Sequence, residues 1–408
     1  MGRVLQPVLA GVVTAVIGFG GAFPVVLSGL RAVGADEHQA ASGLLVVSVA
    51  SGLVAIVLGL RTRMPISIAW STPGAALLLS AGAQPGGFPA AVGAFLLCGV
   101  LIVVSGLVPA LARLVAAIPA HLAGAMLAGV LLPLCIAPVH AVAEIPLLAA
   151  PVVIVWAVLA RFARRWAVPA ALVVAVVLIA VTGPGLSGID LAPVLVWTPP
   201  SFDVATLVGV GLPLFLVTMA SQNVTGMAVL AQFGYRPKLG PILGATGVGT
   251  LLGAPFGGHA VNLAAISAAL AAGPDAGPPE RRWIASVTAG AGMIVLGLGA
   301  GAATAVILLS PPVLVSAVAG LALLGALTSS VAAALADEQG REAAIVTFVV
   351  TAAGVGFLGI GGAFWGLLAG GAMALLHRRR ARPDADQPAS PRLASSGAIS
   401  GSRPRKAR

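Results

Sequence analysis

Charged, aromatic and cysteine residues are all scarce in this chain of 408 residues. Charged residues make up 8% of it, whereas about a quarter of a soluble domain is charged, so the composition excludes an ordinary water-soluble enzyme. The two cysteines, Cys98 and Cys135, both lie in apolar stretches. They are too few for a disulfide framework or a metal site, and we expect no metal and no cofactor.

Hydrophobic residues, in contrast, make up 59% of the chain, and the mean hydropathy is +1.07. A spanning helix needs about 20 apolar residues. Apolar runs separated by charged or turn residues predict an all-α polytopic membrane protein with about fourteen transmembrane segments. The 53 glycines and 30 prolines are too many for a bundle of straight helices.

The positions of the basic residues predict the topology. With the N-terminus in the cytoplasm and fourteen alternating spans, all of the 22 Lys and Arg residues except Arg31 fall on the cytoplasmic side. One span more or fewer would invert half of the loops, so the bias favours an even number of spans and two cytoplasmic termini. The apolar run after Arg3 is too long for a signal peptide and is interpreted as a retained first span.

An internal duplication follows from the predicted number of spans. A repeat of seven spans followed by its copy must be inverted across the membrane, as in many secondary transporters. We expect a first repeat over 1–185, a periplasmic or extracellular connection over 186–203, and a second repeat over 204–377. Residues 378–408 hold most of the net charge of +10 and predict a disordered cytoplasmic tail. Attraction to anionic lipid explains this tail better than binding to nucleic acid.

The third segment of each half contains a break. In Met64–Gly82 the stretch before Ser71 alternates like a strand, and in Gly253–Gly273 the residues Ala254–Gly258 include Pro and two Gly. Each break precedes a short helix, and Ser71 or Thr72 before Pro73 is a good helix start. The N-termini of two such half-helices, brought together near the bilayer midplane, would suit an anion. The alternative is a pair of glycine-kinked helices with no ligand.

Neutral polar residues gather in the eighth segment. Thr218, Ser221, Gln222 and Thr225 recur at the spacing of one helical face, with Asn223 beside them. Buried amides without partners cost roughly 1–3 kcal/mol each, so they need an explanation. They either join helices or coordinate a ligand.

His259 is the only histidine deep in a predicted span. An imidazole titrates near neutral pH, so His259 is either a proton carrier or a packed core residue. Asn262, one helical turn further on, would face the same way. Phe19, Trp70 and Phe256 lie near the middle of segments beside the predicted site. Core packing explains each of them alone, and together they would form an aromatic slot.

Three motifs resemble the benzoate:proton symporter family, BenE-type transporters of the bacterial inner membrane. They are IAWSTPGAALL (Ile68–Leu78), VTMASQNVTGMAVL (Val217–Leu230) and PFGGHAVNLAAISAAL (Pro255–Leu270). The similarity covers nearly the whole chain except the tail. It implies a fold similar to that of the uracil transporter, with inverted repeats, core and gate domains, and short strands in segments 3 and 10.

The resemblance implies a substrate site and a function. With the aromatic residues and His259 above, the implied substrate-binding set is Phe19, Trp70, Ser71, Thr72, Gly74, Ser221, Gln222, Asn223, Phe256, Gly257, Gly258, His259 and Asn262. Relatives of the uracil type carry carboxylates on segments 8 and 10, and this chain has none there, which favours an anionic cargo. We therefore expect import of benzoate or a related aromatic carboxylate with protons by alternating access.

Several alternatives stay open. The proton is carried either by His259 or by the cargo. Another anion or a nucleobase is the alternative cargo, and a homodimer is left open as the assembly. A membrane-embedded enzyme would need a metal cluster or paired acids within the spans, and the sequence offers neither.

Overall fold

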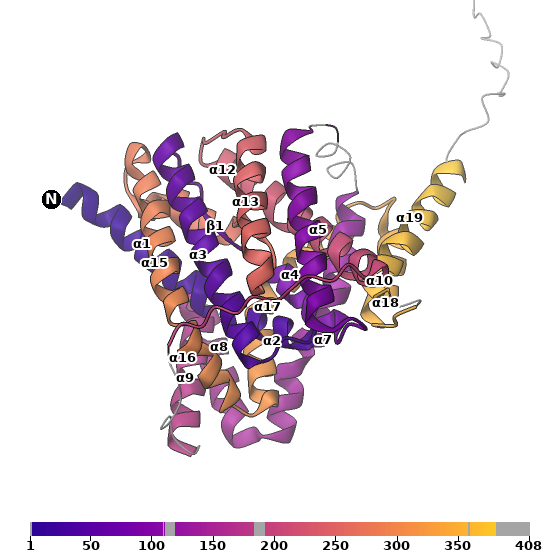
Figure 1. Ribbon diagram of the computed structural model, residues 1–408, viewed down its shortest axis with the longest axis horizontal. Helices are drawn as coiled ribbons and strands as arrows, with labels where there is room; N and C mark the ends of the chain where they lie inside the picture. The colour runs from indigo at the N-terminus through magenta and orange to yellow at the C-terminus, as the bar shows by residue number, and fades with distance from the viewer. Residues whose placement is uncertain (1, 109, 111–118, 183–191, 358–359, 381–408) are drawn as a thin grey trace, which may run out of the picture.

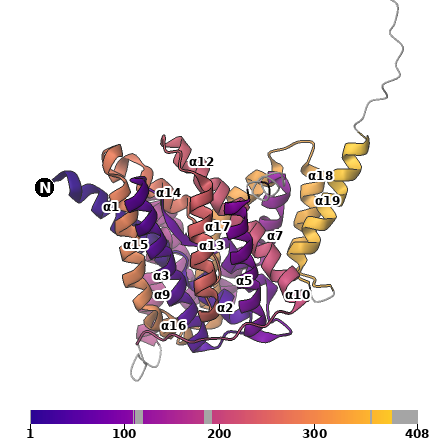
Figure 2. The ribbon, with the colours of Figure 1, turned by 45° about the horizontal axis from the view of Figure 1, so that its top comes forward.

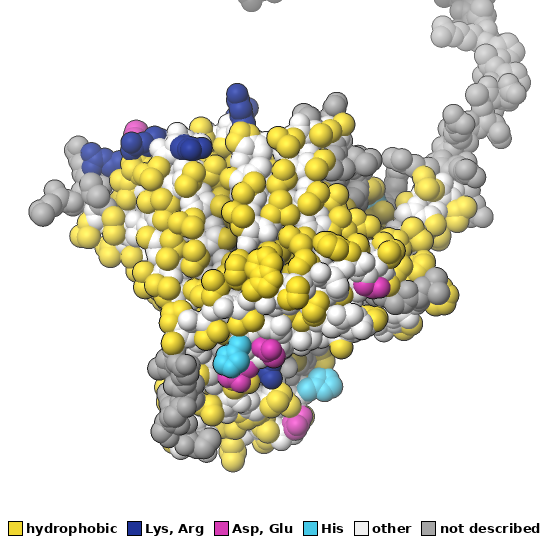
Figure 3. All heavy atoms as spheres, in the orientation of Figure 1, with side chains coloured by type: hydrophobic (Ala, Val, Ile, Leu, Met, Phe, Trp, Pro, Cys, Tyr) yellow, Lys and Arg dark blue, Asp and Glu magenta, His cyan; other side chains and the backbone are white. Residues whose placement is uncertain are grey.

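The computed structural model describes the whole chain except residues 1, 109, 111–118, 183–191, 358–359 and 381–408 (Figure 1). In the described part, eight helices are long and apolar enough to cross a membrane, by length and composition alone. Three further apolar helices are shorter. Figure 3 shows hydrophobic side chains over most of one face, with Lys and Arg gathered at its upper edge.

In the described residues of the first half, one strand interrupts a series of helices. Its elements are α1 (Gly2–Gly20), α2 (Phe23–Ala32), α3 (Glu37–Thr62), β1 (Ile68–Trp70), α4 (Thr72–Ala81), α5 (Gly87–Leu107), α7 (Ala120–Glu144), α8 (Pro146–Phe162), η1 (Arg164–Trp166) and α9 (Ala167–Thr182). The first span is interrupted between α1 and α2, where α1 ends at Gly20 and Gly21 follows. A capping box between Asp36 and Gln39 begins α3.

The second half contains one more strand and a long irregular helix. Its elements are α10 (Val204–Thr206), η2 (Leu207–Gly211), α11 (Leu212–Val217), η3 (Thr218–Val224), α12 (Thr225–Gln232), α13 (Leu239–Gly253), η4 (Ala254–Phe256), β2 (Val261–Leu263), α14 (Ala265–Ala272), η5 (Pro274–Ala276), η6 (Pro279–Arg281), α15 (Trp283–Leu298), α16 (Ala300–Leu308), α17 (Pro312–Leu335), α18 (Arg341–Ala352) and α19 (Gly362–Arg380). Residues 204–232 form a single apolar span that includes two π-helical stretches, η2 and η3.

The helices pack in pairs that join the two halves. α3 lies against α15, α5 against α13, and α7 against α17. Glycines let the first two pairs approach closely: a Cβ on Gly52 would meet the carbonyl oxygen of Gly290, and a Cβ on Gly106 would meet that of Gly240. Small residues at helix contacts are typical of membrane bundles, because close backbone approach replaces the hydrophobic driving force that lipid removes.

Two short strands pair with each other in the middle of this bundle, and we call this pair, together with the residues that flank it, the strand crossing. β1 and β2 are antiparallel, with Ala69 opposite Asn262. Beyond the ladder, Ser71 N donates to Ala260 O at 2.8 Å and Ala264 N donates to Ser67 O at 2.9 Å. The extended backbone of each broken segment is therefore paired with the other, which makes it tolerable inside an apolar bundle.

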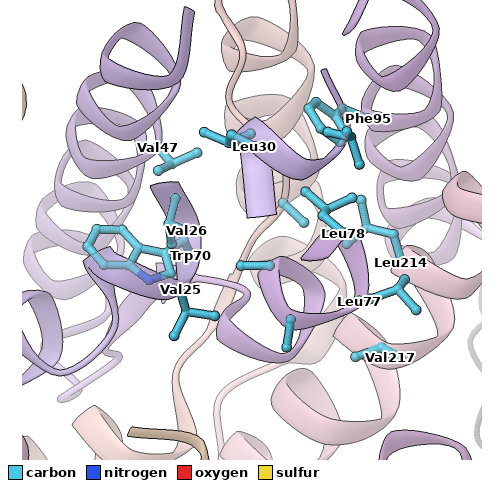
Figure 4. Packing of buried hydrophobic residues seen from close by; sticks show 14 of the residues in the cluster. Val25, Val26, Leu30, Val47, Trp70, Leu77, Leu78, Phe95, Leu214 and Val217 are labelled. Carbon is cyan, nitrogen blue, oxygen red and sulfur yellow. The ribbon is translucent and has the colours of Figure 1, made fainter. Parts of the chain in front are cut away.

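Buried apolar side chains hold this crossing in place. Trp70 of β1 is buried and lies beside Val25 and Val26 of α2 (Figure 4). In the same view, Leu77 and Leu78 of α4 lie near Leu214 and Val217 of the long irregular helix. The half-helix α4 is thus packed between elements from both halves of the chain.

The connection between the halves is extended where it is described. Residues 192–203 cross the bundle toward α10 (Figures 1 and 2). Thr198 N donates to Pro255 O, Ser201 N donates to Pro89 O, and Val196 N donates to Ser42 Oγ. Residues 186–191 of the predicted connection lie outside the described residues. So do residues 381–408 of the predicted tail, whereas 378–380 belong to α19.

Candidate functional site

Ser71 lies at the N-terminus of the first half-helix, α4. Its Oγ accepts a hydrogen bond from Gly74 N at 3.1 Å, so it is the N-cap that the sequence led us to expect. Thr218 Oγ1 also donates to Ser71 Oγ, at 2.9 Å. Thr72 begins α4 and is partly exposed, and Gly74 packs tightly against Leu214. Ser71 Oγ therefore already accepts two hydrogen bonds from protein groups.

His259 lies on the other side of Ser71. The side chain is completely buried, and its Nε2 lies 3.1 Å from Ser71 O. Because a carbonyl oxygen can only accept, Nε2 carries the hydrogen and the ring is held in one tautomer. The Phe95 ring packs edge-on at 6.4 Å between centroids. In the described part of the chain, His259 Nδ1 is buried without a hydrogen-bond partner.

Asn223 ties the long irregular helix to the second strand. The side chain is completely buried, and its Oδ1 accepts a hydrogen bond from Leu263 N at 3.0 Å. In the π-helix η3, residues five apart share a face, so Thr218 and Asn223 both point toward the crossing. The predicted polar face at ordinary helical spacing is wrong in this respect, because Thr225 is exposed. Ser221 and Gln222 are half-buried, and Ser221 Oγ bonds Val217 O.

The second broken segment also differs from the expected helix. Residues 258–260 have no regular structure and 261–263 form β2, so Asn262 does not lie one helical turn beyond His259, although both are completely buried. Gly257 has φ +88°, a conformation that glycine adopts at low cost, and it packs against Gln39 O. Gly258 follows it, packed against Gly253 O. Together the two glycines turn the chain from η4 into the approach to β2.

Two of the three predicted aromatic residues come together. The Phe19 and Trp70 ring centroids are 5.5 Å apart with the planes inclined at 71°, and Phe23 stacks on Phe19 at 5.4 Å between centroids. Phe256 instead packs against Trp197 of the connection, at 5.3 Å. The sequence could not place Phe256, because its neighbour comes from a segment 59 residues earlier that contains no regular structure.

A small cavity that the sequence analysis missed lies beside the second half-helix. It is bordered by α1, β1, α14 and α15, and the hydroxyl-bearing residues of its lining are Thr14, Ser67, Ser267 and Ser286. Ser67 Oγ donates to Ser267 O at 3.2 Å and lies 3.4 Å from Ser286 Oγ. The N-cap of α14 is Ala264, which has no side chain that could cap the helix. In the sequence, each of these four hydroxyl residues stands alone in an apolar stretch, and this is the pattern that could have indicated the cavity.

Metal-binding groups are not found in the described residues: no three His, Cys, Asp or Glu side chains gather as metal ligands would. The residues around the strand crossing instead bring together neutral donors and acceptors, one imidazole (His259) and an aromatic pair (Phe19 and Trp70). Such a set can hold an organic anion by hydrogen bonds and ring contacts, and offers no fixed carboxylate to repel it.

Comparisons with known proteins show what this chain is similar to. A family model described as BenE, benzoate membrane transport protein, matches residues 4–376. The inner membrane protein YdcO of Escherichia coli K12 is 37% identical over 366 residues, covering 89% of this chain and 93% of YdcO. A benzoate membrane transport protein of Acinetobacter baylyi is 29% identical over 375 residues, covering 90% of this chain and 93% of its own.

Two solved structures share the fold. The transmembrane domain of the cyanobacterial bicarbonate transporter BicA superposes with a TM-score of 0.57 at 17% identity, covering 91% of this chain and 98% of that domain. SLC26A9 superposes with a TM-score of 0.62 at 14% identity, covering 92% of this chain and 65% of SLC26A9. The fold is thus that of these helical, multi-pass membrane proteins. The chain belongs to the BenE family of benzoate membrane transport proteins.

Proposed function

We propose that this transporter imports benzoate or a related aromatic carboxylate together with protons by alternating access. The observation that carries the proposal is the strand crossing. It brings the N-termini of α4 and α14 to the centre of the bundle, and no Asp or Glu among the described residues of β1, α4, η3, β2 or α14 opposes an anion there. The Acinetobacter relative, which is named for benzoate transport, supports the choice of cargo.

The architecture in this proposal is fourteen segments in two inverted seven-span repeats. The packing pairs support it: if the second segment corresponds to the ninth and the fourth to the eleventh, then α3–α15 and α13–α5 are the same contact repeated. The reciprocal glycine pairs Gly52–Gly290 and Gly106–Gly240 lie at these two contacts. Both termini would be cytoplasmic, as the distribution of Lys and Arg predicts.

Core and gate domains follow from the same packing. The core would contain α1–α5 and the helices from α10 to α16. The gate would contain α7–α9 and α17–α19, which pack mainly on one another. Relative movement of core against gate would then expose the crossing to either side of the membrane.

The cargo would lie at the crossing with its ring near Phe19 and Trp70. Its carboxylate would receive hydrogen bonds at the half-helix N-termini. In the first half-helix the available groups are Ser71 and Thr72, with Gln222 and Asn223 nearby. Around the second, the uncapped N-terminus of α14 borders the cavity lined by Ser67 and Ser286. His259 is the candidate residue for proton coupling.

Uptake of labelled benzoate by proteoliposomes tests the function directly. An inward proton gradient should accelerate uptake, and an added protonophore should remove the acceleration. Uptake that ignores the gradient would contradict proton symport while leaving benzoate transport intact. Competition by uracil or bicarbonate that exceeds competition by aromatic acids would identify the alternative cargo, a nucleobase or another anion.

A further inference from the structure

We propose that His259 Nδ1 accepts the co-transported proton. The resulting imidazolium and the cargo carboxylate are stable in the core only together. Each transport cycle therefore moves one proton with one carboxylate and no net charge. This inference rests on the proposed function. To that function it adds the atom that takes the proton, the reason why proton and cargo are coupled, and the electrical consequence.

The hydrogen bond to Ser71 assigns the atom. Nε2 donates to Ser71 O at 3.1 Å, and a carbonyl cannot return a hydrogen, so the neutral ring presents a bare lone pair at Nδ1. Nδ1 has no partner among the described residues, and the side chain is 0% exposed. A proton therefore adds to the Nδ1 lone pair while Nε2–H stays on Ser71 O, which gives an imidazolium of charge +1 without moving the ring.

No resident charge surrounds this ring. Among the elements packed around it, the described residues of β1, α4, η3, α13 and β2 contain no other titratable or charged side chain, and α5 contains only the buried thiol of Cys98. The charged and titratable residues of α3 are confined to its two ends, where Glu37, His38 and Arg61 are exposed. An imidazolium at His259 consequently has no fixed counter-ion among the described residues of these elements.

Mutual compensation of charge then couples proton to cargo. An unpaired imidazolium or an unpaired carboxylate in this apolar core is strongly disfavoured, whereas the two charges together attract each other through a medium of low dielectric constant. By linkage, the proton raises the affinity for carboxylate by the factor by which carboxylate raises the affinity for the proton. Above the pH at which His259 protonates, the dissociation constant for benzoate should fall about tenfold for each unit by which the pH is lowered.

The electrical test uses wild-type protein in proteoliposomes. With a fixed inward pH gradient, the membrane potential is set by potassium and valinomycin at zero or at about 100 mV, inside negative, and the accumulation ratio of labelled benzoate is measured. We expect the same ratio at both potentials. One unbalanced charge crossing the whole field would change the ratio by about 50-fold, and a change of that order would overturn the inference. A complete lack of benzoate uptake would instead contradict the proposed function.

The atomic assignment is tested by His259→Gln, with His140→Gln as the matched control. Glutamine can still donate to Ser71 O and cannot take a proton, whereas His140 is an exposed residue of α7. Benzoate binding, read as thermal stabilisation at several pH values, should lose its pH dependence in His259→Gln and keep it in His140→Gln. Retained pH dependence in His259→Gln would mean that the cargo carries the proton. If His259→Gln does not fold, the pH dependence of wild-type binding still decides: a constant affinity from pH 8 to pH 6 would overturn the inference.

Discussion

Thr218 donates a hydrogen bond to Ser71 Oγ at 2.9 Å, which joins the π-helical part of the eighth segment to the cap of the half-helix α4. The two residues are 147 positions apart in the sequence. The backbone oxygen of Ser71 accepts a hydrogen bond from His259 Nε2 of the tenth segment, at 3.1 Å. Both oxygens of a single serine are therefore held by the second half of the chain. Ser71 is the residue through which changes in segments 8 and 10 would reach α4.

Replacing Thr218 with valine should weaken this junction with little change in shape. The variant loses one buried hydrogen bond, which contributes about 1 kcal/mol to folding stability, and leaves Ser71 Oγ with only its bond from Gly74 N. We expect a lower melting temperature and a several-fold higher KM for benzoate uptake. Thr225→Val, on the exposed face of the same helix, is the control and should match wild type in both measurements. Equal behaviour of the two variants would show that the bond to Ser71 is dispensable.

Replacing Asn223 with leucine should abolish uptake while the protein still reaches the membrane. Leu263 N would be left buried without its acceptor, at a cost of about 1–3 kcal/mol, and the strand crossing would shift. Uptake and surface expression are measured together, with Val224→Leu, an exposed neighbour, as the control. Normal transport by Asn223→Leu would mean that this amide only joins helices.

Replacing Gly257 with alanine should impair folding. Its φ of +88° is unfavourable for a residue with a Cβ, and that Cβ would lie 3.1 Å from Gln39 O. Gly244→Ala is the matched control, because Gly244 lies inside α13 with nothing within 4 Å of its added Cβ. We expect Gly257→Ala to lose about 1–3 kcal/mol of stability and Gly244→Ala to gain up to about 1 kcal/mol. A thermal melt of each variant in detergent measures the difference; a Gly257→Ala melt at or above wild type would contradict the strain.

The stability contributed by Asp203 should depend on pH. The backbone N–H and then the hydroxyl of Thr206 bond its carboxylate, and they hold the pKa of Asp203 below its ordinary value. A lowered pKa in the folded state means that the stabilisation is present at neutral pH and is lost as the pH falls through that lowered value. Asp203→Ala should therefore melt below wild type at pH 7, and the two melting curves should converge well below about pH 4. A difference that persists in acid would point to packing.

Replacing Ser286 with alanine tests the cavity beside α14. The change removes the contact with Ser67 Oγ and leaves the backbone of α15 as it is. If the carboxylate is received at α14, KM for benzoate should rise several-fold with little change in expression. Ser329→Ala, an exposed position on α17, is the control. An unchanged KM would place the carboxylate at the α4 side of the crossing.

Some features of the site could be predicted from short-range pattern. Ser71 before Thr72 and Pro73 is a helix start by local chemistry alone, and the structure confirms Ser71 as the cap. Residue spacing places Asn223 only beside the polar stripe, and it is the family resemblance that adds Asn223 to the expected substrate-binding set. Its selection over Thr225 depends on η3 being π-helical, which changes the residues that share a face. The sequence predicts Asn262 one helical turn from His259, because it does not reveal that the chain is not helical between η4 and the end of β2.

The sequence by itself determined three properties: that this chain is a membrane protein, at which residues its third and tenth segments are interrupted, and that the first half-helix has its own cap. These properties follow from composition and from residues a few positions apart. Only the tertiary structure decided which groups meet: Ser71 with Thr218 and His259, Asn223 with Leu263, and Phe256 with Trp197 rather than Trp70. The physical reason is that extended backbone in an apolar bundle must find partners for its polar groups, and here those partners lie in the other half of the chain.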